Sequence, residues 1–318
     1  MKKLLILYFA LIAVATADAR VPDHPDYTDE NGYQYKHFRD KISGHLIQGR
    51  EQEVLFWGVD DRYGELKDKW AAVKKFTVPV KMVVKNKTGK TITLPVTAVD
   101  GHAFNNLPNL EEIVLPEGIT YVNPFALSDT KAKRINIPAS WKENIYNFGG
   151  YKSQWEYISV AKNHPTRCSI NGLIYNKNKT ILYAFPRCRK GEVILPATLK
   201  EIDDDVFEDA EYVTKITLPE GVVKVGKNAF YQCAAETIIL PSTLKTIGIN
   251  ALNYCKKLKS LRCMAKIPPT VLMRENEKDY MELWGIKLET LIVYIPKGSL
   301  KQYKKATWWR KVKNYVEQ

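Results

Sequence analysis

Apolar and polar positions alternate in short runs that recur through the middle of the chain, and several of these runs end in proline. The clearest examples end at Pro116, Pro219 and Pro241. An alternating run fits a short strand with one buried face, and proline ends a strand because it cannot donate a ladder hydrogen bond. Prolines 116, 138, 196, 219 and 241 lie 22, 58, 23 and 22 residues apart, which indicates a repeat with one insertion.

A second short β-like run follows each proline and leads to a pair of one small and one large residue. A single coil of this kind cannot bury its apolar side alone, so successive coils have to stack, with their strands parallel. The pattern predicts a repeat solenoid, mainly β, in which a right-handed coil carries a parallel β-sheet. The small–large pairs are Ala103-Phe104, Phe125-Ala126, Val206-Phe207, Ala229-Phe230 and Ala251-Leu252. The strands of the parallel sheet are expected near residues 112–115, 134–137, 192–195, 215–218, 237–240, 259–262 and 291–295.

Three consecutive stretches carry a resemblance to a known family: TLKEIDDDVFEDAEYVTKITLP, EGVVKVGKNAFYQCAAETIILP and STLKTIGINALNYCKKLKSLRC. They resemble the BspA-like bacterial leucine-rich repeat, whose consensus runs near LPxxVxxIGxxAFxxCxxLxxIxLP, over roughly residues 90–265. Two departures stand out, because Phe125-Ala126 inverts the small–large order and Leu252 replaces phenylalanine. The resemblance implies a leucine-rich-repeat solenoid on a secreted, cell-surface or periplasmic protein of the Bacteroides type. It also implies a role in adhesion or in binding cell-surface proteins.

The interruption of the repeat and the two ends complete the organisation. Residues 172–175, 176–179 and 180–185 have the pattern of strand, polar turn and strand, which predicts one β-hairpin insertion. We interpret the insertion as a structural bridge between the repeat halves, with ligand binding as the alternative. The expected segments are a signal peptide (1–19), an N-terminal capping region (20–90), first repeats (91–138), the insertion (139–190), second repeats (191–265) and a C-terminal cap (266–318).

Both ends of the chain have distinctive composition. Lys2 and Lys3 precede an apolar run over residues 4–15 and then small residues, which is the layout of a cleaved export signal. We therefore expect an exported protein in the periplasm, at the cell surface or outside the cell. The last residues, Gly298 to Val316, have helical apolar spacing surrounded by lysines, and a helical cap on the last coil is expected there. The alternative is a basic aromatic helix that contacts a membrane or nucleic acid.

The five cysteines suggest one disulfide. Cys168 and Cys188 lie almost symmetrically about a turn at Lys177-Asn178, so the hairpin would bring them together. An exported protein meets an oxidising compartment, which favours such a bond. The chain contains no C-x-x-C pair, so a zinc module is not expected.

Candidate chemistry changes the picture little. Neither a nucleophile-elbow motif nor a zinc-protease motif occurs, and the five histidines are scattered. The acidic stretch over residues 201–211 lacks the calcium-loop spacing and is interpreted as a solvated turn. We therefore expect no enzyme, no cofactor and no bound metal. The formal net charge of +13 favours an acidic partner or an anionic surface over nucleic acid, since an exported protein rarely meets nucleic acid.

The outward positions of the predicted strands form the candidate binding face. They are mixed in type and contain no aromatic ladder for sugar stacking, which favours a protein or cell-surface macromolecule as partner. The alternatives are a passive structural role in the envelope and a glycan-binding or glycan-cleaving protein. The pattern leaves the oligomeric state open. The candidate residues are Glu112, Arg134, Asn136, Lys215, Thr217, Thr237, Ser260 and Arg262.

Overall fold

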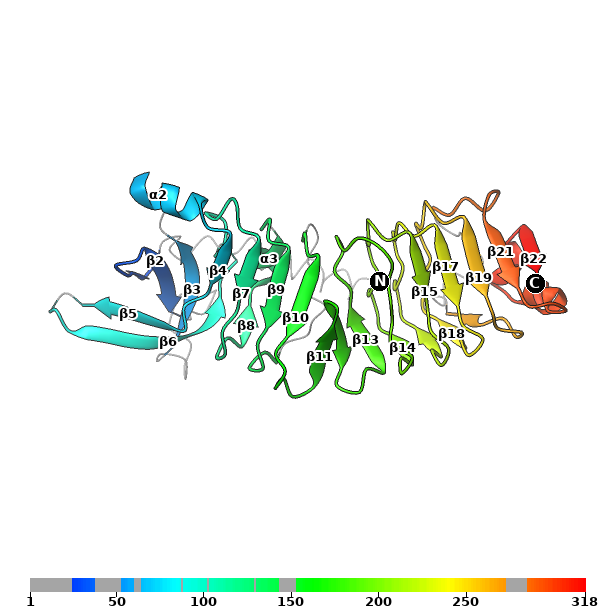
Figure 1. Ribbon diagram of the computed structural model, residues 1–318, viewed down its shortest axis with the longest axis horizontal. Helices are drawn as coiled ribbons and strands as arrows, with labels where there is room; N and C mark the ends of the chain where they lie inside the picture. Colours follow the sequence, from blue (N-terminus) through cyan, green and yellow to red (C-terminus); the bar gives the residue numbers. More distant parts are fainter. Residues whose placement is uncertain are drawn as a thin grey trace, which may run out of the picture. The chain divides into compact units, whose positions relative to one another are not determined.

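The protein is a mainly β solenoid built from two compact units. The computed structural model describes residues 25–37, 53–59, 64–86, 88–101, 103–128, 130–142, 153–272 and 285–318. Unit 1 comprises residues 1–131 and 140–143, and unit 2 comprises residues 132–139 and 144–318. Parallel ladders join strands of successive coils within each unit, as Figure 1 shows. This confirms the repeat solenoid that the sequence predicts. The expected signal peptide, residues 1–19, lies outside the described residues.

Unit 1 opens with a sheet that contains both the N-terminal region and the first repeats. β2 pairs antiparallel with β1 and β3, β3 and β8 each run parallel to β6, and β5 folds back antiparallel on β6. The region that the sequence marks only as a cap is therefore continuous with the first coil. The six strands are β1 (Tyr27–Thr28), β2 (Tyr33–His37), β3 (Val54–Val59), β5 (Lys81–Lys85), β6 (Thr91–Val99) and β8 (Tyr121–Val122).

A second ladder and an aromatic cluster complete unit 1. β4 (Lys75–Thr77) runs parallel to β7 (Glu112–Val114), and the helices are α2 (Gly64–Ala71) and α3 (Pro124–Ser128). Phe56 and Phe76 stack with ring centroids 5.4 Å apart, and Phe104 packs against both. Burial of such rings supplies most of the driving force for a small core.

The expected Phe125-Ala126 pair is wrong in one respect. Phe125 is 61% exposed, whereas Ala126 and Leu127 are 2% and 1% exposed. Ala126-Leu127 therefore fills the coil in the way that Ala103-Phe104 does, so the order of small and large residues is not inverted. The spacing from Phe104 to Leu127 is 23 residues, which restores the period.

Unit 2 carries the most regular ladder of the molecule. Its strands run parallel in a continuous register, with Lys215 opposite Thr237, Thr237 opposite Ser260 and Ser260 opposite Ile292. The alternate residues Ile216, Ile238, Leu261 and Val293 are fully buried, because every second side chain of a strand points into the coil. The strands are β15 (Lys215–Thr217), β17 (Thr237–Leu240), β19 (Ser260–Cys263), β21 (Ile292–Ile295) and β22 (Asn314–Glu317).

A second sheet of unit 2 holds the hairpin and the return strands of the coils. β12 and β13 form the predicted hairpin, and from β13 onward the strands are parallel. The hairpin also carries a strand that the sequence did not predict, since β11 pairs antiparallel with the other edge of β12. The strands are β11 (Arg167–Ile170), β12 (Leu173–Asn176), β13 (Ile181–Ala184), β14 (Glu201–Ile202), β16 (Lys224–Val225), β18 (Thr246–Ile247) and β20 (Thr270–Val271).

Part of the expected insertion is itself a coil of the solenoid. β9 (Arg134–Ile137) pairs in parallel with β10 (Tyr157–Val160), one residue opposite one, within unit 2. The ladder therefore continues past residue 138, where the repeat pattern of the sequence was expected to stop. Val193 adds one isolated parallel bridge to Ile216, so the expected strand near residues 192–195 is reduced to a single pair.

The end of the chain closes the last coil, as expected, but only its first part is helical. α4 (Leu300–Lys305) is followed by the 3₁₀-helix η4 (Trp309–Lys311) and then by β22, which pairs in parallel with β21. The Tyr303 hydroxyl donates to the Ala265 carbonyl at 2.7 Å, and Trp309 Nε1 donates to the Pro269 carbonyl at 2.8 Å. Both aromatic rings are buried, which explains the apolar stripe.

Candidate binding surfaces

The outward side chains of the β15–β22 ladder form two rows across neighbouring coils. The residues between these rows point inward and are buried, so the rows are the exposed side of the sheet. We call these two rows the outward strand face. The first row is Lys215, Thr237, Ser260, Ile292 and Asn314, and the second is Thr217, Ile239, Arg262, Tyr294 and Val316.

The eight predicted face residues fall into three groups. Lys215, Thr217, Thr237, Ser260 and Arg262 come together on the outward strand face. Arg134 and Asn136 also lie in unit 2, at outward positions of β9. Glu112 lies in unit 1, where its carboxylate forms an ion pair of 2.6 Å with Lys75. The candidate set is therefore divided between the units, and its most complete part belongs to unit 2.

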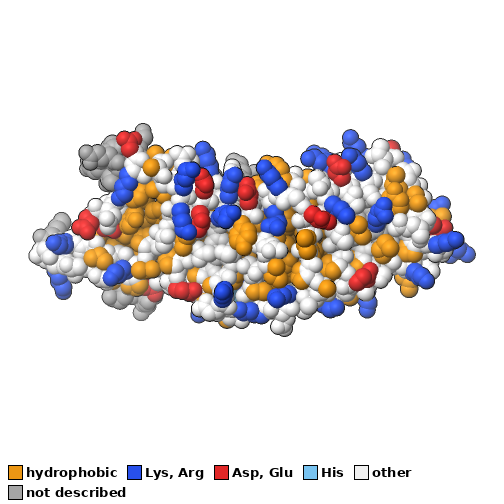
Figure 2. Space-filling view, in the orientation of Figure 1, with side chains coloured by type: hydrophobic (Ala, Val, Ile, Leu, Met, Phe, Trp, Pro, Cys, Tyr) orange, Lys and Arg blue, Asp and Glu red, His pale blue; other side chains and the backbone are white. Residues whose placement is uncertain are grey.

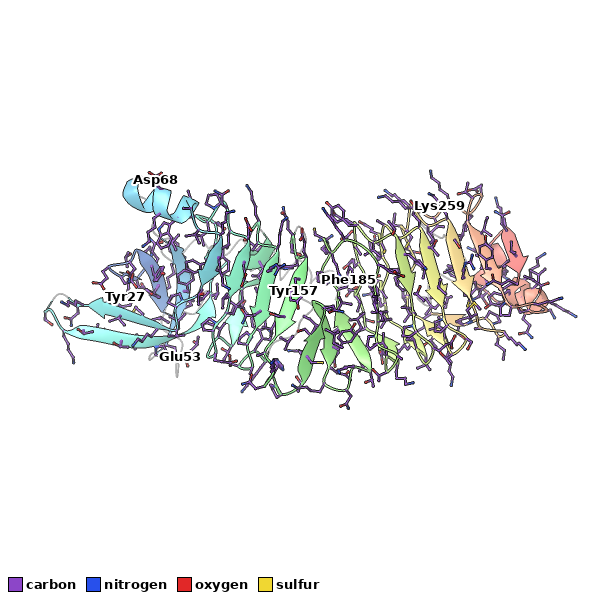
Figure 3. All side chains as sticks on the ribbon, in the orientation of Figure 1. Tyr27, Glu53, Asp68, Tyr157, Phe185 and Lys259 are labelled. Carbon is purple, nitrogen blue, oxygen red and sulfur yellow. The ribbon has the colours of Figure 1, made fainter. Side chains whose placement is uncertain are left out.

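Several outward residues that the sequence reasoning missed are apolar or aromatic. Ile194 is 76% exposed, and Tyr157, Ile292 and Val316 are also exposed. Tyr157 could have been found from spacing, because it follows Arg134 by 23 residues, one repeat period. Figure 3 shows it on β10. Figure 2 shows basic and hydrophobic side chains interspersed on the visible side of unit 2.

Arginine and tyrosine meet twice across neighbouring strands of unit 2. The Arg262 guanidinium lies 4.5 Å from the centroid of the Tyr294 ring, its direct partner in the ladder. Arg134 is placed in the same way, 5.7 Å from the centroid of Tyr157. A cation over an aromatic face is favourable, and the ring holds the arginine in place. Both pairs combine the residue types that are enriched at protein interfaces.

Lysine–glutamate pairs line the start of the strands in unit 2. Lys133 lies 3.2 Å from Glu156, and Lys259 lies 2.9 Å from Glu236. Lys215 is 4.0 Å from Glu192, at the limit of an ion pair. Such exposed pairs stabilise a fold by at most about 1 kcal/mol. They neutralise several lysines and leave Arg134 and Arg262 as cations that rest on aromatic rings.

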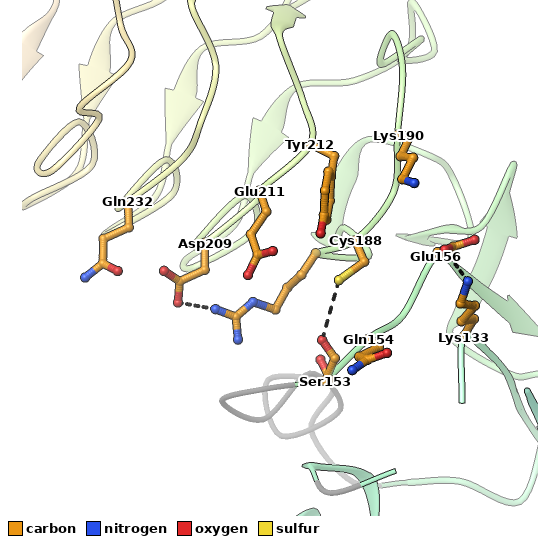
Figure 4. A pocket seen from close by; sticks show the side chains of 11 residues that line it. Lys133, Ser153, Gln154, Glu156, Cys188, Lys190, Asp209, Glu211, Tyr212 and Gln232 are labelled. Atoms are coloured by element: carbon orange, nitrogen blue, oxygen red, sulfur yellow. Dashed lines mark hydrogen bonds and ion pairs between the residues drawn. The ribbon is translucent and has the colours of Figure 1, made fainter. Parts of the chain in front are cut away.

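A pocket of about 590 Å³ opens in unit 2, where the ladder between β10 and β15 is reduced to the single bridge (Figure 4). Its walls come from successive coils, at residues 133, 153–156, 187–190, 209–212 and 232. Backbone hydrogen bonds stack these stretches, since the Cys188 amide donates to the Trp155 carbonyl and the Glu211 amide donates to the Arg187 carbonyl. Arg187 forms an ion pair with Asp209 across the pocket wall.

The cysteines do not supply a reactive thiolate. Burial raises the pKa of the Cys188 thiol in the pocket wall, and nearby Glu211 raises it further. Burial also raises the pKa of Cys233 to about 11 and raises the pKa of Cys255 and Cys263. A thiol must ionise to act as a nucleophile, so these four groups are poor nucleophiles near neutral pH.

The predicted disulfide between Cys168 and Cys188 is absent, because both cysteines are free thiols. Cys168 lies on β11 opposite Tyr175 of β12, whereas Cys188 lies beyond β13 with its amide bonded to Trp155. The symmetry argument assumed a two-stranded hairpin. In the three-stranded arrangement, Cys168 is on the far side of β12 from β13.

The acidic stretch over residues 201–211 binds the next coil. Asp204 Oδ1 accepts from the Lys227 amide at 2.7 Å, and Asp205 Oδ1 accepts from Asn228 Nδ2 at 3.0 Å. The described residues contain no cluster of three His, Cys, Asp or Glu side chains placed to hold a metal ion. No helix among the described ranges is both long and apolar enough to cross a bilayer.

The fold and its face define a leucine-rich-repeat solenoid, and comparison with protein families gives its type. Six copies of the BspA type leucine rich repeat region match residues 83–166 and 179–270. These copies cover more than half of the chain, so the chain belongs to this family. Among curated proteins, none matches the chain.

Solved structures with a similar fold are bacterial leucine-rich-repeat proteins. A leucine-rich repeat protein from Eubacterium ventriosum is 21% identical, with 83% of this chain and 79% of that chain covered and a TM-score of 0.44. A leucine rich cell surface protein from Faecalibacterium prausnitzii is 14% identical, with coverage of 93% and 96% and a TM-score of 0.44. The pneumococcal vaccine antigen PcpA is 17% identical, with coverage of 92% and 98% and a TM-score of 0.42.

Proposed function

We propose that this leucine-rich-repeat protein is a non-catalytic binding protein whose outward strand face in unit 2 binds a protein partner with an acidic surface. The observation that carries the proposal is the outward strand face itself. It presents arginine, tyrosine and aliphatic side chains in two ordered rows on a hydrogen-bonded ladder. A face that is rigid before binding loses little conformational entropy when a partner docks.

The chemistry of the face favours a protein over a small molecule. Aliphatic side chains such as Ile292 and Val316 stand beside Arg262 and Tyr294, and this mixture of apolar area with anchored cations suits a protein surface. A standard interface buries about 800 Å² on each partner, which a row of five strands can supply. The cations at Lys215 and Arg262, with the chain's net charge of +13, favour an acidic partner.

The same proposal includes export and the lack of catalysis. The basic, apolar and small residues over positions 1–19 support export, which the N-terminal sequence of the secreted protein would test. Against catalysis, Asp209 and Glu156 in the pocket are engaged in ion pairs, and the Cys188 thiol stays protonated. A turnover that a single pocket substitution abolishes would disprove the non-catalytic role.

The test is a triple charge reversal, Arg134→Glu, Lys215→Glu and Arg262→Glu, in the full mature chain. Immobilised wild-type protein captures partners from envelope and host-surface extracts, and each captured protein is then purified and its affinity measured directly. We expect the triple variant to bind the acidic partner at least tenfold more weakly, mostly through faster dissociation. Its melting temperature should stay close to that of the wild type, since all three residues are on the surface.

A matched control keeps the charge change but moves it to the other sheet. Lys200, Lys245 and Lys266 are exposed and precede β14, β18 and β20, so Lys→Glu at these three positions changes the charge equally. Equal loss of binding in both triple variants would reduce the effect to net charge and contradict the proposal. If no purified protein binds the wild type, a passive structural role in the envelope becomes the better explanation.

A further inference from the structure

The pocket of unit 2 contains buried polar groups that the fold leaves without partners. Ser153 is 3% exposed, and its Oγ has no hydrogen-bond partner within the part of the chain that the structure describes. The same holds for Nε of Arg187, although another nitrogen of its guanidinium pairs with Asp209. Folded proteins satisfy nearly all buried polar atoms, so unpaired atoms in a pocket wall mark places where a ligand can bond.

The lining of the pocket is polar but electrically balanced. Nine of its eleven residues are polar or charged, and the exceptions are Cys188 and Tyr212. Three cations, Lys133, Arg187 and Lys190, stand against three anions, Glu156, Asp209 and Glu211. Since two of these pairs are already formed, neither an anionic nor a cationic ligand gains a strong net attraction. The pocket suits a neutral ligand that carries many hydrogen-bonding groups.

One aromatic ring gives the pocket an apolar patch. Tyr212 is 46% exposed, and Lys190 Nζ lies 5.3 Å from its ring centroid. Glu211 lies next to it in the sequence, and Gln154 and Gln232 present amide groups to the same pocket (Figure 4). Planar amides and carboxylates exchange pairs of hydrogen bonds with neighbouring hydroxyls, while an exposed ring packs on C–H groups.

We infer that this pocket is a binding site for a neutral saccharide. Ser153 Oγ and Arg187 Nε donate to sugar oxygens, the Glu211 carboxylate accepts from hydroxyls, and the Tyr212 ring packs against the C–H face of a sugar ring. A volume of about 590 Å³ falls in the range of small-ligand pockets. A peptide side chain fits less well, because most peptide anchors are apolar and this lining is not. The site is separate from the outward strand face.

The test measures binding of D-glucose, D-galactose, D-mannose, N-acetyl-D-glucosamine and cellobiose to the mature full chain, by saturation-transfer difference NMR and calorimetry. We expect at least one of these sugars to bind. Tyr212→Ala should weaken it about tenfold, and Ser153→Ala about fivefold. Tyr212→Phe should retain binding, because the ring and not its hydroxyl makes the contact.

Controls separate this site from a general loss of structure and from the protein-binding face. Tyr121→Ala removes a tyrosine of similar exposure, 40%, from β8 of unit 1 and should leave sugar binding unchanged. Arg262→Glu on the outward strand face should also leave it unchanged. The inference fails if none of the five sugars binds, if Tyr212→Ala binds as tightly as the wild type, or if only an anionic probe such as galactose 6-sulfate binds.

Discussion

The second repeats of unit 2 and the first repeats of unit 1 build the same coil turn in two different ways. In unit 2 the turn residues Asp205, Asn228 and Asn250 have φ of 60°, 53° and 57°, the left-handed conformation. In unit 1 the equivalent position is Phe125, which lies in helix α3 directly after Pro124. Asp and Asn tolerate the left-handed region, whereas proline is favoured at the first position of a helix. A residue choice at one turn position therefore decides whether the coil turns tightly or through a helix.

The difference extends to how closely the coils approach. In unit 2, a Cβ on Gly248 would lie 2.5 Å from the Gly226 carbonyl oxygen, and a Cβ on Gly226 would lie 2.5 Å from the Asp203 carbonyl carbon. The backbones of these turns are in direct contact. In unit 1, a Cβ on Gly101 would meet only side-chain atoms of Asn123 and Phe125, at 3.3 Å. The tight turn needs glycine for stacking, and the helical turn does not.

The largest expected effect concerns the side chains that fill the coils. Phe230 is 1% exposed and stacks on Phe207 with ring centroids 5.4 Å apart and ring planes at 9°. Phe230→Ala should lower the free energy of unfolding of unit 2 by about 3–5 kcal/mol, because the cavity cannot close. Urea denaturation followed by circular dichroism would measure this change.

The matched substitution in unit 1 is Phe125→Ala. Phe125 is 61% exposed, so its removal should change stability by no more than about 0.5 kcal/mol. Leu127→Ala, at the buried position, should cost about 2–5 kcal/mol. A large loss on Phe125→Ala with little loss on Leu127→Ala would reverse our assignment of the coil-filling residue.

A glycine substitution tests the close approach of the coils with a smaller expected effect. Gly248→Ala forces apart two stacked backbones and should lower the stability of unit 2 by about 3 kcal/mol. Hydrogen–deuterium exchange should show faster opening of peptides that cover residues 220–263. Gly101→Ala in unit 1 meets movable side chains and should change stability by less than about 1 kcal/mol. Similar losses for the two variants would show that the turns are equally tight.

Most of the strand ladder could be predicted from sequence because proline marks its strand ends. β7, β9, β15, β17, β19 and β21 lie within one residue of the predicted segments. β10 was missed because Ala161, not proline, follows its last residue, Val160. β22 was missed because the lysines and aromatic residues before it have helical spacing. The strands β1–β5 belong to no repeat, so no period could reveal them.

The candidate surfaces were predictable to different degrees. Alternation alone identifies outward positions such as Lys215 and Arg262, because a strand has a period of two. The pocket could not be predicted, since its walls come from stretches between residues 133 and 232 that only stacking brings together. The Tyr294 ring beside Arg262 depends on the register between β19 and β21, which a 32-residue separation in sequence conceals.

The smallest effect is a difference in how the two units respond to alkaline pH. Burial raises the pKa of the Cys233 thiol in unit 2 to about 11, and the chain has no cysteine before residue 168. An unfolded thiol ionises near pH 8.5, so between about pH 8.5 and 11 the unfolded state releases a proton that the folded state keeps. The stability of unit 2 should therefore fall as the pH rises through this window, by on the order of 2 kcal/mol for Cys233. In unit 1 the buried Tyr35 phenol has a raised pKa, but its unfolded form ionises only near pH 10, so the loss there should begin later. Urea denaturation under reducing conditions at pH 8, 9 and 10 would measure the slope, and Cys233→Ala should make it shallower. A slope that is the same in wild type and Cys233→Ala would show that this thiol is not the group whose ionisation the folded unit resists.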